Sequence, residues 1–296
     1  MDVHFFGPAE RQLLGVSYPP RRPSSHTDTP ARCVLICPPL GQEYVRSYWA
    51  LGLVAGQLAR KGIHAMRFDY RGHGDSFAST EQVCSLEEWK SDIKEAIQQA
   101  KRFSGAESVM LLGLRAGAGL AAEVASERDD VNALVAWEPV TNGSSYLAML
   151  RKVHALMLDL WYQPIATPND DKKEELLGQQ YDRSLIDELE KWQIDLATTL
   201  VPQLIVNPST AVGNAEEDAS PWQRIVKTND KDSWNKLIDL EAAWLRPQTS
   251  QTVINTIVEM FDRLTRLDML RPVREHAGHP AEHASNETDQ AKESLR

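Results

Sequence analysis

The stretch LLGLRAGAGL, residues 111–120, combines three structural signals in ten residues. Its apolar start is typical of a strand buried on both faces of a parallel sheet, and its alanine-rich end favours a helix. Gly113 and Gly117 lie between these parts and permit a tight turn. The residue at the centre of the turn is Arg115, whose guanidinium is always protonated and has no lone pair for nucleophilic attack. The stretch therefore predicts a strand–turn–helix unit with a permanent cation at its turn.

Apolar runs and segments of helical period alternate around this unit. The predicted strands are residues 33–39, 63–70, 108–113 and 131–139, and the helical segments are 48–60, 86–103 and 117–127. Such alternation predicts an α/β fold, with a mostly parallel sheet and helices on both of its faces. Two short apolar stretches in residues 4–18 predict an additional hairpin at the sheet edge.

The second half of the chain predicts an interruption of this core. Amphipathic helical patterns fill residues 144–200 without a strand signal, which predicts a helical cap insertion of two or three helices. Residues 1–143 would then form the N-terminal part of the core and residues 201–270 its C-terminal part. Residues 271–296 are polar, and we expect a disordered tail there. Within the C-terminal part, strands are expected at 202–206 and 223–228 and a helix at 250–267.

The composition excludes several classes of protein. The 296 residues contain 42 acidic and 32 basic side chains, a formal charge of −10 that disfavours nucleic acid and anionic lipid as partners. Three cysteines without paired metal spacing predict neither a disulfide framework nor a metal site, and we expect no cofactor. The sequence has no signal-like start and no apolar run long enough to span a membrane, so a cytoplasmic location is expected.

Two motifs resemble the α/β-hydrolase fold. DYRGHGDS, residues 69–76, follows one predicted strand, and GLRAG, residues 113–117, follows the next about forty residues later. In that fold an Asp-x-Arg-Gly-x-Gly-x-Ser turn precedes the nucleophile elbow Gly-x-Ser-x-Gly, so Arg115 occupies the serine position. The resemblance implies that the first motif stabilises a turn below the site, through Asp69, Arg71, Gly72, Gly74 and Asp75.

Five motifs together narrow the resemblance. They are CPPLGQEYVRS, FDYRGHGDS, SLEEWKSDI, LLGLRAGAGLAAE and WEPVTNG, in that order. They resemble the second type of exosortase-A-system-associated hydrolases, a subgroup of serine aminopeptidase-like proteins in which the elbow also carries arginine. The resemblance implies ester or acyl-type substrates and a link to exopolysaccharide and exosortase systems.

The residues needed for serine hydrolysis are incomplete. That mechanism requires a nucleophilic hydroxyl, a histidine to accept its proton, and a carboxylate that orients the histidine. Arg115 cannot supply the first, and the stretch IVKTNDKDSWN, residues 225–235, contains no histidine where the fold would place one. The sequence therefore predicts that the Ser–His pair is absent.

The remaining features predict an anion-binding site. Arg115 would lie at the start of the helix that begins near Ala116, where free backbone N–H groups favour negative charge. Backbone donors near Leu40 and Gly41, together with the side chain of Arg46, would add to it. The result would bind a carboxylate, phosphate or sulfate. Alternatively, Arg115 pairs with Glu43 or Glu138 and forms a buried ion pair with a structural role.

Three functional interpretations remain open. In the first, the protein is an enzyme of unconventional mechanism, and Glu43 or Glu138 serves as its acid or base. In the second, the chain is a non-catalytic binding protein or scaffold, whose partner is an anionic or acyl-bearing small molecule or a protein. In the third, residues 117–122 form a Gly-x-Gly-x-x-Ala dinucleotide motif, with Glu138 about twenty residues later.

Overall fold

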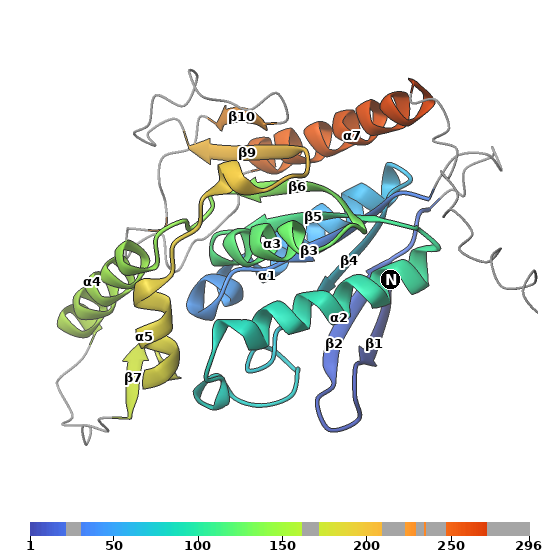
Figure 1. The fold of residues 1–296 in the computed structure, drawn as a ribbon. Coiled ribbons are helices and arrows are strands. Elements are labelled where there is room, and N and C mark those ends of the chain that lie inside the picture. Colours follow the sequence, from blue (N-terminus) through green and yellow to red (C-terminus); the bar gives the residue numbers. More distant parts are fainter. Residues whose placement is uncertain (22–30, 162–171, 209–222, 229–233, 235–246, 271–296) are drawn as a thin grey trace, which may run out of the picture. The chain divides into compact units, whose positions relative to one another are not determined.

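The computed structural model describes residues 1–21, 31–161, 172–208, 223–228, 234 and 247–270 (Figure 1). The chain divides into two compact units, Met1–Val258 and Glu259–Arg296. The first unit contains the sheet and the elbow. The part of the second unit that is described is the end of helix α7 (Pro247–Leu270), and the expected disordered tail at 271–296 lies outside the described residues. In the described residues, no helix is long and apolar enough to cross a membrane.

An eight-stranded sheet forms the centre of the first unit. Its order is β1-β2-β4-β3-β5-β6-β9-β10. The strands are β1 (Asp2–Phe6), β2 (Leu13–Tyr18), β3 (Cys33–Cys37), β4 (His64–Phe68), β5 (Val109–Leu114), β6 (Val131–Trp137), β9 (Gln203–Pro208) and β10 (Gln223–Thr228). β1 and β2 form an antiparallel hairpin at the edge, and β2 also pairs antiparallel with β4, whereas the pairs from β4 to β10 are parallel. The predicted sheet and edge hairpin are therefore confirmed.

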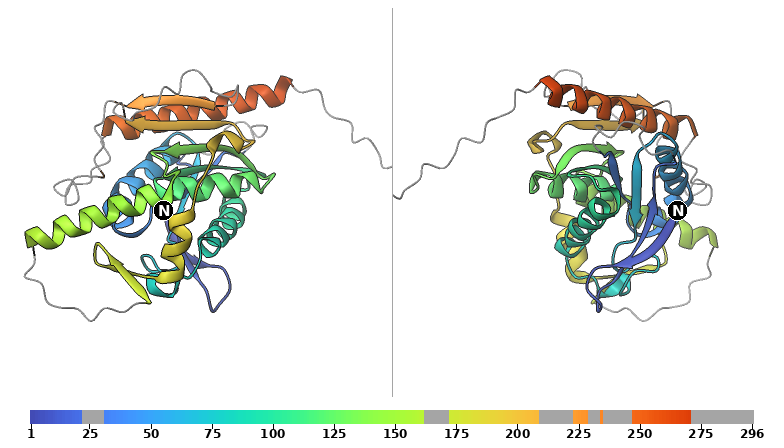
Figure 2. Two further views of the ribbon diagram at one scale, coloured as in Figure 1. Left: turned by 60° about the vertical axis from the view of Figure 1, so that its left-hand side comes forward. Right: turned by 90° about the vertical axis from the view of Figure 1, so that its right-hand side faces the viewer.

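Helices cover both faces of this sheet, as predicted. α1 (Gly41–Arg60) packs on one face, and α2 (Leu86–Ser104) and α3 (Ala116–Ser126) pack together on the other (Figure 2). Every residue of β5 is buried, and Trp89, Ile93 and Ile97 place a fully buried i, i+4 row of α2 in the core. α1 begins at Gly41 rather than at residue 48, because residues 41–47 are helical and do not form a loop.

The insertion contains a strand pair that the sequence analysis did not predict. It consists of α4 (Gly143–Trp161), the antiparallel strands β7 (Lys173–Leu176) and β8 (Gln179–Asp182), and α5 (Arg183–Lys191). A short 3-10 turn, Leu196–Thr198, follows α5, and another, Thr80–Gln82, lies before α2 and outside the insertion. Leu177 and Gly178 both have positive φ, +52° and +82°, which is the conformation of a two-residue hairpin turn. The expectation of helices alone is therefore wrong at these residues. Their glutamate and leucine residues have high helix propensity, and for this reason the sequence predicted a helix there.

The elbow has the strained geometry that its glycines make possible. Arg115 has φ +55° and ψ −124°, an uncommon conformation for a residue with a side chain. A Cβ on Gly113 would overlap the backbone of Ala118, and one on Gly117 would overlap the carbonyl of Pro38. A Cβ on Gly119 would lie 2.6 Å from the Trp192 ring. These glycines allow α3 to pack closely against its neighbours, so the structure gives them a packing role that does not need a dinucleotide.

We expect Gly117→Ala to lower the free energy of unfolding by about 2–3 kcal/mol, because the new methyl group would overlap backbone that cannot move aside. Urea denaturation measures this difference. Gly56→Ala is the matched control, since Gly56 lies within α1 and a Cβ added there would have nothing within 4 Å. The control should raise stability by about 0.5–1 kcal/mol. Equal effects at both positions would contradict the packing role of Gly117.

Candidate functional site

A buried ion pair occupies the elbow. The Nε of Arg115 donates to Glu43 Oε1 at 3.1 Å, and the Tyr146 hydroxyl donates to Glu43 Oε2 at 3.1 Å. The side chains of Arg115 and Glu43 are 15% and 3% exposed. Arg115 comes from the turn after β5, Glu43 from the first turn of α1, and Tyr146 from α4 of the insertion. The ion pair therefore connects the core helix α1, the elbow and the insertion.

Electrostatics keep Arg115 charged. Burial alone would lower its pKa, but the negative charges of Glu43 and Glu138 hold the pKa above its ordinary value. Burial also raises the pKa of Tyr146 well above its ordinary range, so its hydroxyl stays protonated and donates to Glu43. The elbow thus carries a fixed cation, paired on one side with a carboxylate.

Three charged side chains, those of Arg115, Arg46 and Glu138, contact Trp234. The guanidinium carbons of Arg115 and Arg46 lie 5.3 and 5.1 Å from the centre of the Trp234 ring, within range of cation–π attraction. The indole Nε1 of Trp234 donates to Glu138 Oε2 at 2.8 Å. Glu138 directly follows β6 and has φ +46°. Like Arg115, it therefore has a backbone conformation that is uncommon for a residue with a side chain. Four of the sequence-predicted side chains, those of Arg115, Arg46, Glu43 and Glu138, therefore meet at one end of the sheet.

The predicted donor at Gly41 is already engaged. Its backbone N–H donates to His73 Nε2 at 2.9 Å, and the Tyr181 hydroxyl occupies the space that a Cβ on Gly41 would take. Because Nε2 accepts, the proton of the neutral ring lies on Nδ1, which is 3.3 Å from the carbonyl oxygen of Arg71. The sequence analysis missed His73, since it searched for histidines only after the elbow. Leu40 and Ala116 are buried at the start of α1 and α3, where they were expected.

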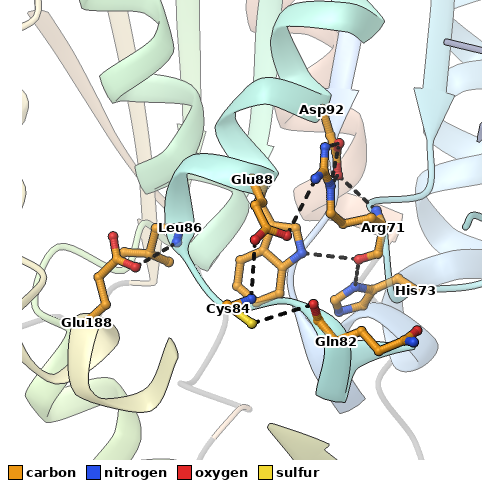
Figure 3. A network of polar contacts seen from close by, with 9 residues as sticks. Arg71, His73, Gln82, Cys84, Leu86, Glu88, Asp92 and Glu188 are labelled. Carbon is orange, nitrogen blue, oxygen red and sulfur yellow. Dashed lines mark hydrogen bonds and ion pairs between the residues drawn. The ribbon is translucent and has the colours of Figure 1, made fainter. Parts of the chain in front are cut away.

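The turn motif positions His73 through a second buried ion pair (Figure 3). Arg71 bonds to Asp92 through Nη2 at 2.6 Å and Nε at 2.9 Å, and its backbone N–H donates to the same carboxylate at 2.9 Å. The carbonyl oxygen of Arg71 accepts from Trp89 Nε1 at 3.2 Å and faces the ring of His73. A continuous chain of hydrogen bonds therefore runs from Asp92 on α2 to Gly41 at the start of α1.

The other turn residues have structural contacts. Gly72 and Gly74 have positive φ, and a Cβ on Gly74 would overlap the carboxylate of Asp69. The backbone N–H of Asp75 donates to Asp69 Oδ2 at 3.3 Å, and the Ser76 hydroxyl donates to the Asp69 carbonyl at 2.6 Å. These contacts support the structural role that the resemblance implied for the turn.

No substitute nucleophile is seen among the described residues. The Ser47 hydroxyl donates to the carbonyl of Glu43 at 2.8 Å, and His154 Nδ1 accepts from the backbone of Leu177 at 3.0 Å. Cys33 and Cys37 are buried, and burial raises the pKa of both thiols, that of Cys33 to about 12. In the described part of the chain no serine hydroxyl is hydrogen-bonded to a histidine, and no three metal-binding side chains cluster together.

A hollow of about 560 Å³ lies away from the elbow, between α2, α3 and α5. Its lining includes Lys90, Glu123, Lys191 and Trp192. Trp192 Nε1 donates to Glu123 at 3.1 Å, so part of this lining is held by contacts within the protein. The hollow does not include Arg115, and it contributes nothing to the geometry of the elbow.

The burial of His73 predicts a pH-dependent stability. Burial lowers its pKa from 6.5 to about 4, so the unfolded chain binds the proton at a higher pH than the folded chain does. The free energy of unfolding should fall by about 3 kcal/mol as the pH drops from 7 to 4. Burial raises the pKa of Asp69 and Asp92, and these groups oppose the trend. The measured quantity is therefore the difference between the wild type and His73→Gln, whose amide oxygen also accepts a hydrogen bond. Parallel pH profiles for the two proteins would contradict the buried neutral imidazole.

Comparisons with known proteins agree with this architecture. The family profile described as serine aminopeptidase, S33, matches residues 29–225. No curated protein matches. Similar solved structures include Est1E from Butyrivibrio proteoclasticus with ferulic acid bound, at 18% identity and a TM-score of 0.57, covering 86% of this chain and 98% of that one. Mouse alpha/beta hydrolase domain-containing protein 10 shares 16% identity at a TM-score of 0.53, covering 89% and 100%. An esterase of Pyrococcus furiosus shares 15% at 0.53, covering 88% and 90%. At these identities the likeness shows the α/β-hydrolase fold.

Proposed function

Because this chain belongs to the serine aminopeptidase S33 family of α/β-hydrolase-fold proteins, we propose that it is a non-catalytic member that binds an anionic, acyl-bearing small molecule at Arg115. One observation carries the proposal. A permanent cation stands at the strained elbow position, where the fold presents its nucleophile. A side chain of this kind attracts a negative group but cannot form a covalent bond with an acyl carbon.

The guanidinium of Arg115 retains binding capacity beside Glu43. Its Nε is bonded to Glu43, whereas within the described residues neither terminal Nη is seen to donate a hydrogen bond. Two N–H groups in a fixed plane match the oxygens of a carboxylate or phosphate. Arg46 places a second cation against the Trp234 ring, and the buried rings of Trp234 and Tyr146 lie against the Arg115 guanidinium, so an acyl or aryl group would pack beside them.

Both candidate acid–base groups are committed to contacts within the protein, which favours binding over catalysis. Glu43 accepts from Arg115 and from Tyr146, and Glu138 accepts from Trp234. Proton transfer by either carboxylate would have to break one of these bonds. An enzyme of unconventional mechanism is therefore the weaker interpretation.

Calorimetric titration of the full chain tests the proposal. The probes are an aryl carboxylate such as ferulate, octanoate and inorganic phosphate, with the first chosen because Est1E was solved with ferulic acid. Arg115→Met should weaken carboxylate binding at least about tenfold, because a charge-assisted pair is lost. Arg151→Met is the matched control, since Arg151 pairs with Glu174 in the insertion. Equal affinities in wild type and Arg115→Met, or absence of binding for all probes, would overturn the proposal.

The resemblance in five motifs extends the proposal to a biological setting. It links the chain to exopolysaccharide and exosortase systems and implies a ligand that carries an acyl group. Three free cysteines agree with a reducing compartment.

A further inference from the structure

The outward face of α1 is apolar. Val45, Trp49 and Leu53 follow one another at four-residue spacing, and their exposed fractions are 56%, 81% and 62%. The opposite face of the same helix is buried against the sheet. A helix of a globular protein normally presents polar side chains to water on its outer face, so this row is unusual.

The edge strand β1 also carries exposed apolar side chains. Val3 and Phe5 of β1 are 60% and 55% exposed. Val3 pairs with Val16, which in turn pairs with Arg67, and cross-strand partners share a face of the sheet. Arg67 donates from Nη1 to a carbonyl oxygen of α1 at 2.9 Å, so this is the face that α1 covers. We call these five exposed residues, Val3, Phe5, Val45, Trp49 and Leu53, the α1 surface.

Cations gather at the end of α1. Arg60 is its last residue, Lys61 caps it, and the backbone N–H of Arg21 donates to the carbonyl of Ala59 at 3.1 Å. All three cationic residues are exposed, and none forms an ion pair with another described residue. The helix itself contains one acidic residue, Glu43, which is buried against Arg115. The chain as a whole carries a charge of −10, yet this face combines exposed apolar side chains with positive charge.

We propose that the α1 surface docks on an anionic lipid bilayer. Trp49, Val45 and Leu53 enter the boundary between headgroups and acyl chains, where tryptophan is favoured, and the cations at the end of the helix contact lipid phosphates. A second copy of the chain is a poorer partner, because it brings the same cations and no exposed carboxylate on α1. The acidic residues elsewhere do not prevent docking, because salt screens charges beyond about 10 Å at 0.1 M ionic strength.

Vesicle co-sedimentation of the full chain tests this surface. The protein should sediment with vesicles of phosphatidylcholine and phosphatidylglycerol and stay largely in solution with phosphatidylcholine alone. Arg60→Gln and Lys61→Gln should each weaken partitioning about fivefold at about 0.1 M ionic strength. Trp49→Ser combined with Leu53→Ser should weaken it at least about tenfold, because two apolar side chains no longer insert. Phe77→Ser is the matched control, since Phe77 is a 48% exposed aromatic residue outside the α1 surface.

Every other outcome overturns the proposal. These outcomes are no binding to anionic vesicles, equal binding to neutral vesicles, or unchanged binding by the Trp49→Ser/Leu53→Ser protein. Sedimentation velocity adds the remaining test. A dimer that this double variant dissociates would assign the α1 surface to a second copy. The variants change only exposed side chains, so a matching melting temperature and circular dichroism spectrum will show that loss of binding is not loss of fold.

Discussion

Glu43→Ala should lower the free energy of unfolding by about 3–5 kcal/mol, one of the two largest effects that we expect from a single substitution. Glu43 is the carboxylate partner of the buried Arg115 and the acceptor for Tyr146. Its removal leaves a permanent cation with 15% exposed side chain next to a cavity, and a buried hydroxyl without its acceptor. Urea denaturation monitored by tryptophan fluorescence measures the difference.

A double-variant cycle separates the contribution of the ion pair to stability from that of the packing lost with the Glu43 side chain. Glu43→Ala combined with Arg115→Met removes both charges and fills part of the space, so most of the lost stability should return. Glu175→Ala, at an exposed position of β7, is the control and should change stability by less than about 0.5 kcal/mol. Purely additive effects of the two site substitutions would contradict the coupling between Glu43 and Arg115.

Asp92→Ala should also lower the free energy of unfolding by about 3–5 kcal/mol, because it breaks the buried ion pair between Asp92 and Arg71. Asp92 has a 1% exposed side chain and receives three hydrogen bonds from Arg71 at 2.9 Å or less. Without it, the Arg71 guanidinium is left without the carboxylate that neutralises it. The carbonyl of Arg71 also orients His73, so the disturbance should reach Gly41 at the start of α1.

The same arginine supplies the control for this prediction. Glu88 contacts Arg71 Nη1 at 3.4 Å, but its side chain is 31% exposed. Glu88→Ala should therefore cost less than about 1 kcal/mol, because solvent screens and replaces a partly exposed pair. If Glu88→Ala and Asp92→Ala destabilise the protein equally, burial does not determine the strength of these contacts.

The sequence sufficed for the core because its signals are local and redundant. β3 and β5 are buried along their whole length and therefore consist of uninterrupted apolar runs, and the glycines beside Arg115 specify one tight turn. The hairpin at Leu177–Gly178 was missed because its flanking residues favour helices, and only the two positive φ angles determine the turn.

The site was only partly predictable, because its geometry depends on tertiary contacts. The sequence placed Glu43 and Arg115 near one end of the sheet but left open whether they pair or bind a ligand. Tyr146 lies 103 residues after Glu43. Nothing in the helical sequence around it shows whether its hydroxyl donates to a carboxylate or its ring only packs in the core. His73 escaped notice for a similar reason: its role requires a backbone N–H 32 residues earlier in the chain.

The most direct test of the account is mass spectrometry of the purified chain after incubation with a fluorophosphonate ester, a reagent that traps activated serines as stable adducts. The protein should retain its unmodified mass, and its rate with chromogenic esters should equal the background rate. Arg115→Ser should also remain unlabelled, because His73 Nε2 already accepts from the backbone of Gly41, and His154, the one described histidine after the elbow, accepts from that of Leu177. A stoichiometric adduct on a serine of the wild type, with ester turnover that is lost when that serine is replaced, would contradict the claim that a cation has replaced covalent chemistry at this elbow.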